Sequence, residues 1–268
     1  MAEHAPDASG KEPRAEAKGA SVIVNVIQVL RCFTLDEPLL GVTEIALRVG
    51  LHKSSVSRIL ATLEDQNIVE RDEESRKFRL GLGLIAVAGP LLANLDVRRV
   101  AFPTLAELSE TTGETAALTI WNGGEAISVE QIPSSKQVKH TSPMGSRYNT
   151  ALSASVQVFL AHEPESEVRG LLESGSVILD PDTPGGIEAY LLRLAAVRDA
   201  GYAVNHGETN IEEVGLAAPV HDHRGAVIAA VMIAAPYYRV PAERLQVLGR
   251  ACRQAATQIG LRLGALPR

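Results

Sequence analysis

The chain of 268 residues has a formal net charge of −6, with 46% hydrophobic and 22% charged residues. These values exclude an intrinsically disordered chain and are typical of a soluble globular protein whose length suits about two domains. The negative balance excludes nucleic-acid binding through bulk charge, so any DNA contact must come from a local basic face.

The cysteine content and the hydropathy pattern indicate the cellular environment of the protein. Cys32 and Cys252 are the only cysteines, and they form no C-x-x-C pair. This usage favours a reducing, cytoplasmic environment and gives no zinc or redox motif. No stretch resembles a signal peptide, and no run of roughly 18 apolar residues occurs, so we expect no membrane partner.

The first predicted structure is a helix preceded by a tail. Residues 1–20 are rich in alanine, proline, glycine and mixed charges, which predicts a disordered segment. From residue 21 on, apolar residues recur at steps of three and four, which predicts a helix with one buried stripe. The stripe consists of Ile23, Val26, Ile27, Leu30 and Phe33.

Two helices separated by a glycine are predicted next. Thr43 can cap a short helix with its hydroxyl, and Gly50 can end that helix in the left-handed conformation. A longer helix over residues 53–66 follows, with Val56 and Leu60 on its apolar face. A short helix, a tight turn with glycine and a longer helix form the helix-turn-helix pattern.

A change of period after this helix predicts a small hairpin. Residues 68–71 and 77–80 have the composition of strands, and the polar residues between them suit a turn. Residues 21–81 are therefore predicted to form a winged helix-turn-helix DNA-binding domain. Helical periodicity over residues 82–95 predicts a linker helix.

Residues 96–268 mix helices with antiparallel hairpins, which predicts an α+β domain around one sheet. Two hairpins are centred on the turns at 122–124 and 222–225. The predicted strands are 116–120, 126–132, 138–140, 216–221 and 226–233, and the predicted helices are 97–112, 150–161, 187–200 and 241–263. No internal repeat is present.

The exposed side of the helix at 53–66 has the chemistry of a DNA-reading surface. Serine hydroxyls can bond to phosphates or base edges, and the Arg58 guanidinium can bind a guanine or a phosphate. Arginine and lysine in the wing can meet backbone phosphates beside it. The predicted DNA contacts are Thr43, Lys53, Ser54, Ser55, Ser57, Arg58, Arg76 and Lys77. The alternative is a solvated surface helix and hairpin without a DNA-binding role. Stronger helix formers would suit such a helix better than three serines, because serine weakens a helix interior.

Two motifs have alternative interpretations. Residues 81–86 match the loose pattern G-x-G-x-x-A, but the strand before them is too charged for a dinucleotide-binding fold. His221, Asp222 and His223 could suggest a metal site, but neighbouring side chains in a turn diverge, so a structural turn is favoured. None of the common catalytic signatures occurs, so we expect no enzyme activity, no catalytic residues, no metal and no cofactor.

The stretch VTEIALRVGLHKSSVSRILATLEDQNIVERD, followed by RKFRLGLGLIAVA, closely resembles the DNA-binding domain and linker of the IclR family of bacterial transcriptional regulators. The block GYAVNHGETNIEEVGLAAPVHDHRGAVIAAVMIAAPYYRV resembles the effector-domain signature of that family. The resemblance covers about residues 21 to 264. It implies a GAF-like sensor domain after the linker, homodimers that can pair into tetramers, and palindromic operators. Small organic acids or aromatic compounds are the effectors that it implies, with repression or activation as the outcome.

By family position, the resemblance implies an effector pocket lined by His140, Tyr148, Ala154, Ser155, Asn210, Pro219, Met232 and Ala234. The alternation of the last strand supports part of this assignment. Val227, Val231 and Ile233 should pack on helices while Ile228, Met232 and Ala234 face the cavity. Small side chains leave room for a ligand, and a few polar groups can orient it. Ordinary core residues are the alternative interpretation.

This sequence departs from the family at two places. Many members have a glycine-lysine-alanine motif beside the pocket, whereas residues 149–157 contain no lysine, and Gly215 replaces a frequent cysteine. The sequence as a whole predicts a DNA-binding transcriptional regulator controlled by a small molecule. The alternative is an enzyme or metabolite-binding module whose helix-turn-helix serves protein contacts.

Overall fold

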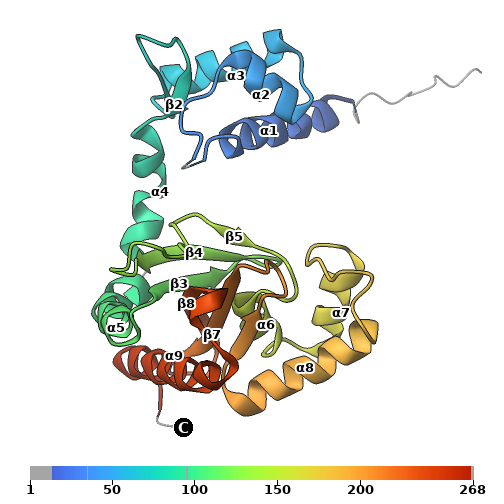
Figure 1. Ribbon diagram of the computed structural model, residues 1–268. Helices are drawn as coiled ribbons and strands as arrows, with labels where there is room; N and C mark the ends of the chain where they lie inside the picture. Colours follow the sequence, from blue (N-terminus) through green and yellow to red (C-terminus); the bar gives the residue numbers. More distant parts are fainter. Residues whose placement is uncertain (1–13, 35, 95, 267–268) are drawn as a thin grey trace, which may run out of the picture. The chain divides into compact units, whose positions relative to one another are not determined.

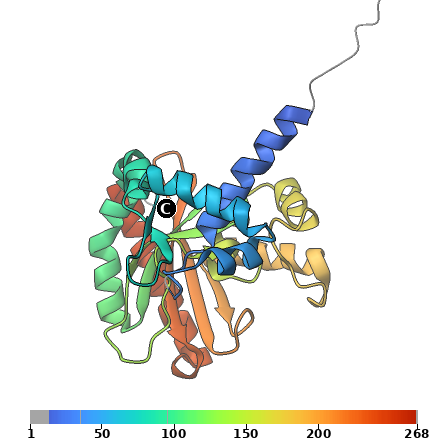
Figure 2. The ribbon, with the colours of Figure 1, turned by 90° about the horizontal axis from the view of Figure 1, so that it is seen from above.

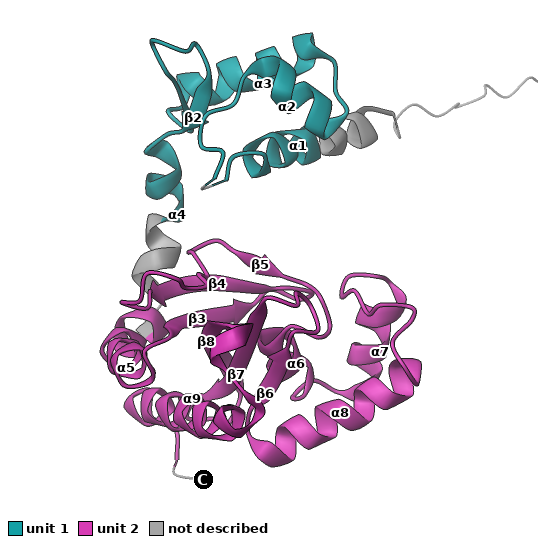
Figure 3. Cartoon of the chain, in the orientation of Figure 1, with its two compact units in different colours: residues 1–94 teal, residues 95–268 magenta. Residues whose placement is uncertain are grey.

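The computed structural model describes residues 14–34, 36–94 and 96–266, and the side chains of residues 22–34, 36–88 and 97–266. The chain divides into two compact units, residues 1–94 and residues 95–268 (Figure 3). Among the described residues, none of the helices combines the length and the apolar character needed to span a bilayer.

The first unit contains a three-helix core, a two-stranded wing and a further helix (Figure 1). Its elements are α1 (Arg14–Arg31), α2 (Val42–Val49), α3 (Lys53–Asp65), β1 (Val69–Arg71), β2 (Phe78–Leu80) and α4 (Gly83–Asn94). Val29, Ile45, Val56, Leu60 and Phe78 are among the buried residues that form its core. The wing strands pair in antiparallel fashion, as the change of period predicts.

The start of α1 and its buried face differ from the prediction. The helix begins at Arg14, so the predicted tail ends earlier than residue 20, and residues 1–13 lie outside the described residues. Ile23 and Ile27 are 64% and 43% exposed, whereas Val29 is fully buried. Among the α1 side chains that the structure describes, apolar residues therefore occupy more of the helix surface than one stripe, and several of them are not covered within one chain.

The prediction that Thr43 caps α2 is wrong. The helix starts at Val42 with Gly41 as its N-cap, and Thr43 is exposed within the first turn. The Glu44 carboxylate accepts a hydrogen bond of 2.6 Å from the Gly41 amide. Glycine is acceptable at an N-cap, and an acidic residue at the third helical position replaces the missing hydroxyl.

The two glycines of the G-x-G-x-x-A motif have a packing role between β2 and α4. Gly83 donates a backbone hydrogen bond of 2.9 Å to the carbonyl of Asn67, which itself has a φ of +57°. A Cβ atom on Gly81 or Gly83 would lie 2.4 or 2.6 Å from that carbonyl oxygen. Glycine is required because no side chain fits this close backbone approach.

The second unit is built on a six-stranded antiparallel sheet with the order β5-β4-β3-β8-β7-β6. The strands are β3 (Thr115–Trp121), β4 (Ala126–Ile132), β5 (Arg147–Tyr148), β6 (Ala203–His206), β7 (Glu213–His221) and β8 (Val227–Pro236). The helices are α5 (Asp96–Thr112), α6 (Ala154–Leu160), α7 (Glu165–Glu173), α8 (Gly186–Ala200), the 3-10 turn η1 (Tyr237–Arg239) and α9 (Ala242–Arg262).

The helices cover both faces of this sheet, as Figures 1 and 2 show. Helices α5 and α9 pack on one face, where Leu105 and Ile259 meet Val231. Helices α6, α7 and α8 cover part of the other face, where Val158 and Tyr190 are buried. The second face is called the inner face below.

Several short elements differ from the prediction. The strand predicted at 138–140 is wrong, because this segment is a loop whose His140 carbonyl accepts a hydrogen bond of 2.6 Å from the Thr115 hydroxyl. The elements β5, β6 and α7 are present without having been predicted. Strands of two to four residues are too short for a period of two to identify them.

The alternation predicted for the last strand is confirmed over most of β8. Val231 and Ile233 pack towards α5 and α9, so Met232 and Ala234 lie on the inner face. Val227 packs in the inner-face cluster and Ile228 in the opposite one, which reverses the prediction for these two residues. The register between β7 and β8 shifts between Val220 and His221, which forms a β-bulge. The bulge changes the faces of the sheet on which Val227 and Ile228 lie.

Candidate nucleic-acid interface and effector site

Helix α3 presents polar side chains opposite its buried face. Val56 and Leu60 are fully buried in the core of the first unit. Lys53, Ser54, Ser57 and Arg58 are exposed, and Ser55 is half-buried. The predicted recognition face is therefore open on the described chain, with Ser55 at its margin.

The cations of the wing divide into paired and unpaired groups. Lys77 contacts Glu44 at 3.0 Å, and Arg79 contacts Glu70 at 3.2 Å. Arg76 is exposed at the wing turn with a φ of +59°. Within the described part of the chain, neither Arg76 nor Lys53 nor Arg58 has an ion-pair partner. These three cations remain available for phosphate or base contacts.

The wing turn is held by Asp72. Its carboxylate accepts hydrogen bonds from the Ser75 amide at 2.8 Å and from the Ser75 hydroxyl at 2.6 Å. These hydrogen bonds lower the pKa of the Asp72 carboxyl, so the turn contains a carboxylate at neutral pH. Arg76 therefore lies on a turn that hydrogen bonds between Asp72 and Ser75 stabilise.

On the inner face, residues of neighbouring strands lie in register. One row consists of Asn205, Gly215, Ala234 and Thr115, and the next contains Ala217, Met232, Ala117 and Gln131. Gly215 and Ala234 retain partial exposure, whereas Ala217 and Met232 are buried. The small, partly exposed residues of the first row mark a candidate ligand space at this end of the sheet.

Helix α6 packs against this part of the inner face. A Cβ atom on Gly215 would lie 3.7 Å from the Cβ of Ala154, so the two residues face each other. The Ser155 hydroxyl is buried, and no hydrogen-bond partner for it is found among the described residues. Four residues later, Phe159 stacks on Trp121 of β3 with ring centroids 5.3 Å apart, which places Ser155 on the side of α6 towards β3. A buried hydroxyl without a partner is a candidate ligand contact.

Two loops border the same space. Tyr148 donates a hydrogen bond of 2.7 Å to the Ser142 hydroxyl, and burial raises the pKa of this tyrosine. His140 reaches across to the segment before β7, where its Nε2 lies 3.0 Å from the Glu212 carbonyl and its Nδ1 lies 3.6 Å from the Glu213 carboxylate. His140 therefore joins the two loops beside the inner face.

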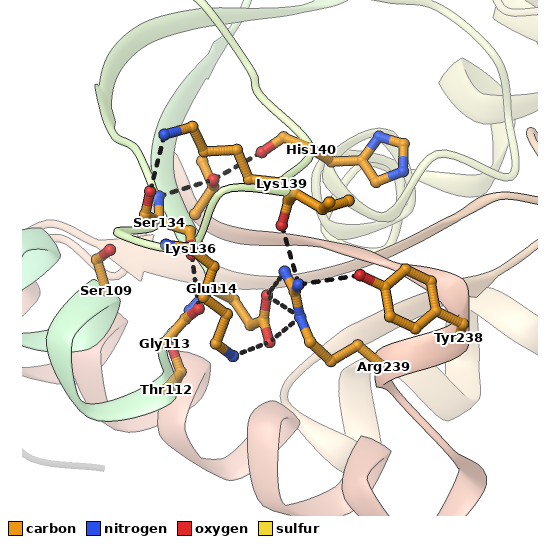
Figure 4. A network of polar contacts seen from close by, with 12 residues as sticks. Ser109, Thr112, Gly113, Glu114, Ser134, Lys136, Lys139, His140, Tyr238 and Arg239 are labelled. Atoms are coloured by element: carbon orange, nitrogen blue, oxygen red, sulfur yellow. Dashed lines mark hydrogen bonds and ion pairs between the residues drawn. The ribbon is translucent and has the colours of Figure 1, made fainter.

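The loop that contains His140 is anchored at a buried charge cluster (Figure 4). The side chain of Glu114 is fully buried and contacts Arg239 at 2.7 Å, Lys136 at 3.1 Å and Arg244 at 3.2 Å. Burial alone would raise the pKa of Glu114, but hydrogen bonds from Arg239 and Lys136 outweigh it and lower the pKa. This carboxylate ties β3 to the loop, η1 and α9.

The predicted effector residues differ in their placement. Ala154, Ser155, Met232 and Ala234 lie together at the inner face, with His140 and Tyr148 at its border. Pro219 lies on the inner face two residues beyond Ala217, paired with Ala230. Asn210 is exposed, and its side-chain oxygen accepts a hydrogen bond of 3.0 Å from the Glu212 amide. Its observed contact is therefore within a turn.

Sequence reasoning missed Asn205, which is buried in the first row. Its side-chain oxygen accepts the Glu208 amide at 2.9 Å, and its side-chain nitrogen donates to the Thr209 hydroxyl. The alternation of Ala203 and Asn205 with Val204 was the available signal, but it falls in a strand of four residues.

The turn with two histidines is organised by Asp222. The Asp222 carboxylate accepts the amides of Arg224 at 2.8 Å and Ala226 at 2.9 Å, which accounts for this residue structurally. A surface hollow of about 210 Å³ lies beside this turn, and another of about 270 Å³ lies between α5 and α9. Neither of these two hollows is lined by a residue predicted to contact the effector.

Comparison with known proteins matches both units. Residues 22–73 match the IclR helix-turn-helix domain, and residues 90–261 match the C-terminal domain of bacterial IclR transcriptional regulators. The chain belongs to the IclR family. It is a DNA-binding transcriptional regulator.

Two curated relatives of this IclR-family chain come from Escherichia coli. The transcriptional repressor AllR is 29% identical over 254 residues, which cover 94% of this chain and 93% of AllR. The transcriptional regulator XynR is 30% identical over 243 residues, which cover 90% of this chain and 96% of XynR.

Solved structures support the same fold. An IclR homologue from Microbacterium hydrocarbonoxydans, complexed with 4-hydroxybenzoate, is 26% identical with a TM-score of 0.75. The match covers 90% of this chain and 98% of the homologue's chain. A domain of another IclR-family regulator is 56% identical with a TM-score of 0.62, covering 65% of this chain and 99% of its own.

Proposed function

We propose that this IclR-family regulator reads its operator with the outer side of α3 and the wing. The supporting observation is the group of cations without ion-pair partners in the described chain, Lys53, Arg58 and Arg76. The serines of α3 add hydrogen-bond donors, while Thr43 and Lys77 contact the flanking backbone. In this assignment residues 21–81 form the DNA-binding domain and residues 82–95 form the linker helix. Residues 96–268 bind the effector and mediate oligomerisation.

Arg58→Ala is expected to weaken specific operator binding by about 1–3 kcal/mol, because the guanidinium can bond to a base edge with two hydrogen bonds. The measurement is fluorescence anisotropy with a duplex selected in vitro by the wild-type protein. Arg79→Ala is the matched control, since Arg79 is already paired with Glu70 at 3.2 Å. Equal affinity of Arg58→Ala and wild type would remove Arg58 from the contacts.

The functional form proposed here is a homodimer, with a dimer of dimers as its larger assembly. Apolar side chains on α1, on α4 and at the residue before α4 are exposed on the single chain, as expected for a surface that a second copy covers. They are Val22, Ile23, Val24, Ile27, Leu82, Ile85 and Val87. Two recognition helices would then enter major grooves about 34–36 Å apart, or at a multiple of this spacing. Sedimentation velocity at micromolar concentration distinguishes these states from a monomer.

The effector, proposed to be a small organic acid or an aromatic metabolite, binds at the inner face. The space above Gly215 and Ala234 and the buried Ser155 hydroxyl support this location. Proposed contacts are His140, Tyr148, Ala154, Ser155, Asn210, Pro219, Met232 and Ala234, joined by Asn205. Binding stabilises one of two arrangements of the DNA-binding units, which alters operator affinity.

Met232→Trp is expected to fill this space and abolish the effector response while DNA binding persists. The probe is the organic acid or aromatic compound that most stabilises the wild type in a thermal-shift screen. At about 100 times its dissociation constant, this probe adds about 2.7 kcal/mol to wild-type stability and nothing to the variant. Leu192→Trp, at an exposed position of α8, is the control. A wild-type response of Met232→Trp would place the effector elsewhere.

The rival function is a metabolite-binding module or enzyme that uses its helix-turn-helix for protein contacts. Salt dependence separates the two, because a DNA-binding protein releases counterions and loses affinity as the salt concentration rises. Binding to operator fragments at two salt concentrations is the test. A DNA-binding role also supports the proposed cytoplasmic location.

A further inference from the structure

The inner face ends in a carboxylate beside its row of small residues. Val214 and Leu216 pack towards α5 and α9, so Glu213 shares the inner face with Gly215. Glu213 pairs with Pro236 and therefore lies two residues along the strand from the pair of Gly215 and Ala234, as the next pair on the same face. A molecule above these small residues would lie next to this carboxylate.

The surroundings of Glu213 come from three separate segments. His140 Nδ1 lies 3.6 Å from its carboxylate, and the Thr209 hydroxyl donates to it at 3.3 Å. Thr209 in turn accepts a hydrogen bond from Asn205, the buried residue of the first row. Burial is the main cause that raises the pKa of Tyr148, and the negative charge of Glu213 adds to it.

The charge of Glu213 is not neutralised by lysine or arginine in the described chain. Among the described residues, His140 is the one basic side chain within 4 Å of the Glu213 carboxylate, and the Glu213 side chain is 38% exposed. The cations near the His140 loop are used elsewhere: Arg239, Lys136 and Arg244 contact Glu114, as Figure 4 shows for the first two. Lys139 donates to the Ser134 carbonyl at 3.1 Å.

We propose that Glu213 is a specificity-determining residue that accepts a hydrogen bond from a hydroxyl or amino group of the effector. This inference rests on the proposed effector site and narrows its ligand class. A partly desolvated carboxylate attracts a donor and repels a second carboxylate, so an acid must present its own carboxylate elsewhere. The buried hydroxyl of Ser155, which has no partner in the described chain, offers a second polar contact at the same space.

The test uses matched compounds that differ in one group: 4-hydroxybenzoate, 4-aminobenzoate and benzoate, then lactate, alanine and propionate, with glycerol and xylose as neutral polyols. Binding to the full chain is measured by thermal shift and calorimetry. The hydroxyl- or amino-bearing member of a set is expected to bind about 10–100-fold more tightly than the unsubstituted acid, because a site built for a donor rejects the analogue that lacks it.

Variants at two adjacent glutamates assign the preference. Glu213→Ala is expected to reduce the preference to about twofold or less, because the acceptor is removed. Glu213→Gln keeps an acceptor without the charge, so it is expected to retain part of the preference for hydroxyl compounds and lose that for amines. Glu212→Ala is the matched control, since its side chain is exposed and only its carbonyl contacts His140.

The possible outcomes separate this inference from the function on which it rests. Wild-type protein that binds unsubstituted acids at least as tightly as their hydroxyl and amino analogues would overturn the role of Glu213 and leave the sensor function intact. An unchanged preference in folded Glu213→Ala would do the same. If no compound of the set stabilised the wild type, both this inference and the proposed ligand class would fail, while DNA binding would be unaffected.

Discussion

Glu114→Ala is expected to destabilise residues 95–268 by about 3–5 kcal/mol, the range for removing one partner of a buried ion pair. Its side chain is fully buried against Arg239, Lys136 and Arg244, so the substitution leaves cations without their carboxylate. The four residues come from separate segments, and the loop that contains His140 would lose its anchor. Effector binding would weaken together with stability.

Urea unfolding measures this effect in the full chain. Trp121 is the single tryptophan and lies in β3, so its fluorescence follows the second unit. Glu107→Ala, at an exposed position of α5, is the matched control. A loss of less than about 1 kcal/mol for Glu114→Ala would mean that the cluster resembles a solvent-exposed ion pair.

The same carboxylate predicts a pH dependence. The pKa of Glu114 is lowered in the folded protein, so its contribution is fully present above the ordinary pKa of 4.5 and is lost as the pH falls through the folded value. The stability difference between wild type and Glu114→Gln should therefore be constant from neutral pH down to about pH 5 and shrink below it. A difference that grew in acid would contradict this sign.

Phe78→Ala is expected to remove about 3–5 kcal/mol from the first unit, the range for deleting a buried aromatic side chain. Phe78 is 2% exposed, and its backbone exchanges hydrogen bonds of 3.0 and 2.9 Å with Leu40. Arg71 also stacks over its ring at 4.7 Å. A small unit has little stability to lose, so operator binding should disappear.

Two measurements separate this outcome from general unfolding. Operator binding and proteolytic resistance of residues 22–94 should both fall, while the Trp121 unfolding transition should stay within about 0.5 kcal/mol of wild type, because distant sites in separate cores act independently. Leu47→Ala, at a residue 79% exposed on α2, is the control for folding. A joint loss of both units would show that they fold as one.

The polar face of α3, which is proposed to bind DNA, could be predicted residue by residue because its geometry is local. A helical period of 3.6 residues assigns Val56 and Leu60 to one side and Lys53, Ser57 and Arg58 to the other without knowledge of the rest of the fold. The structure agrees with this division. Ion pairing could not be predicted, since Lys77 meets Glu44 from a different element.

The proposed effector site was less predictable because its residues come from several strands and loops. Family position suggested Asn210, but the register places Asn205 in the row with Gly215 and Ala234. A β-bulge exchanges the sides of Val227 and Ile228, which no alternation in one strand reveals. Such features depend on how segments pair, and one extra residue changes the face on which a side chain lies.

By itself the sequence determined the helix-turn-helix, the wing, the two central hairpins and the α+β class, since each depends on the period of side chains within one segment. Only the tertiary structure decided that Glu114 joins four segments and that His140 lies beside Glu213 near Gly215. Local propensity selects helices and strands. The contacts that shape a ligand site form between residues far apart in the chain. Their partners are fixed only when the strands pair in register and the helices pack on the sheet.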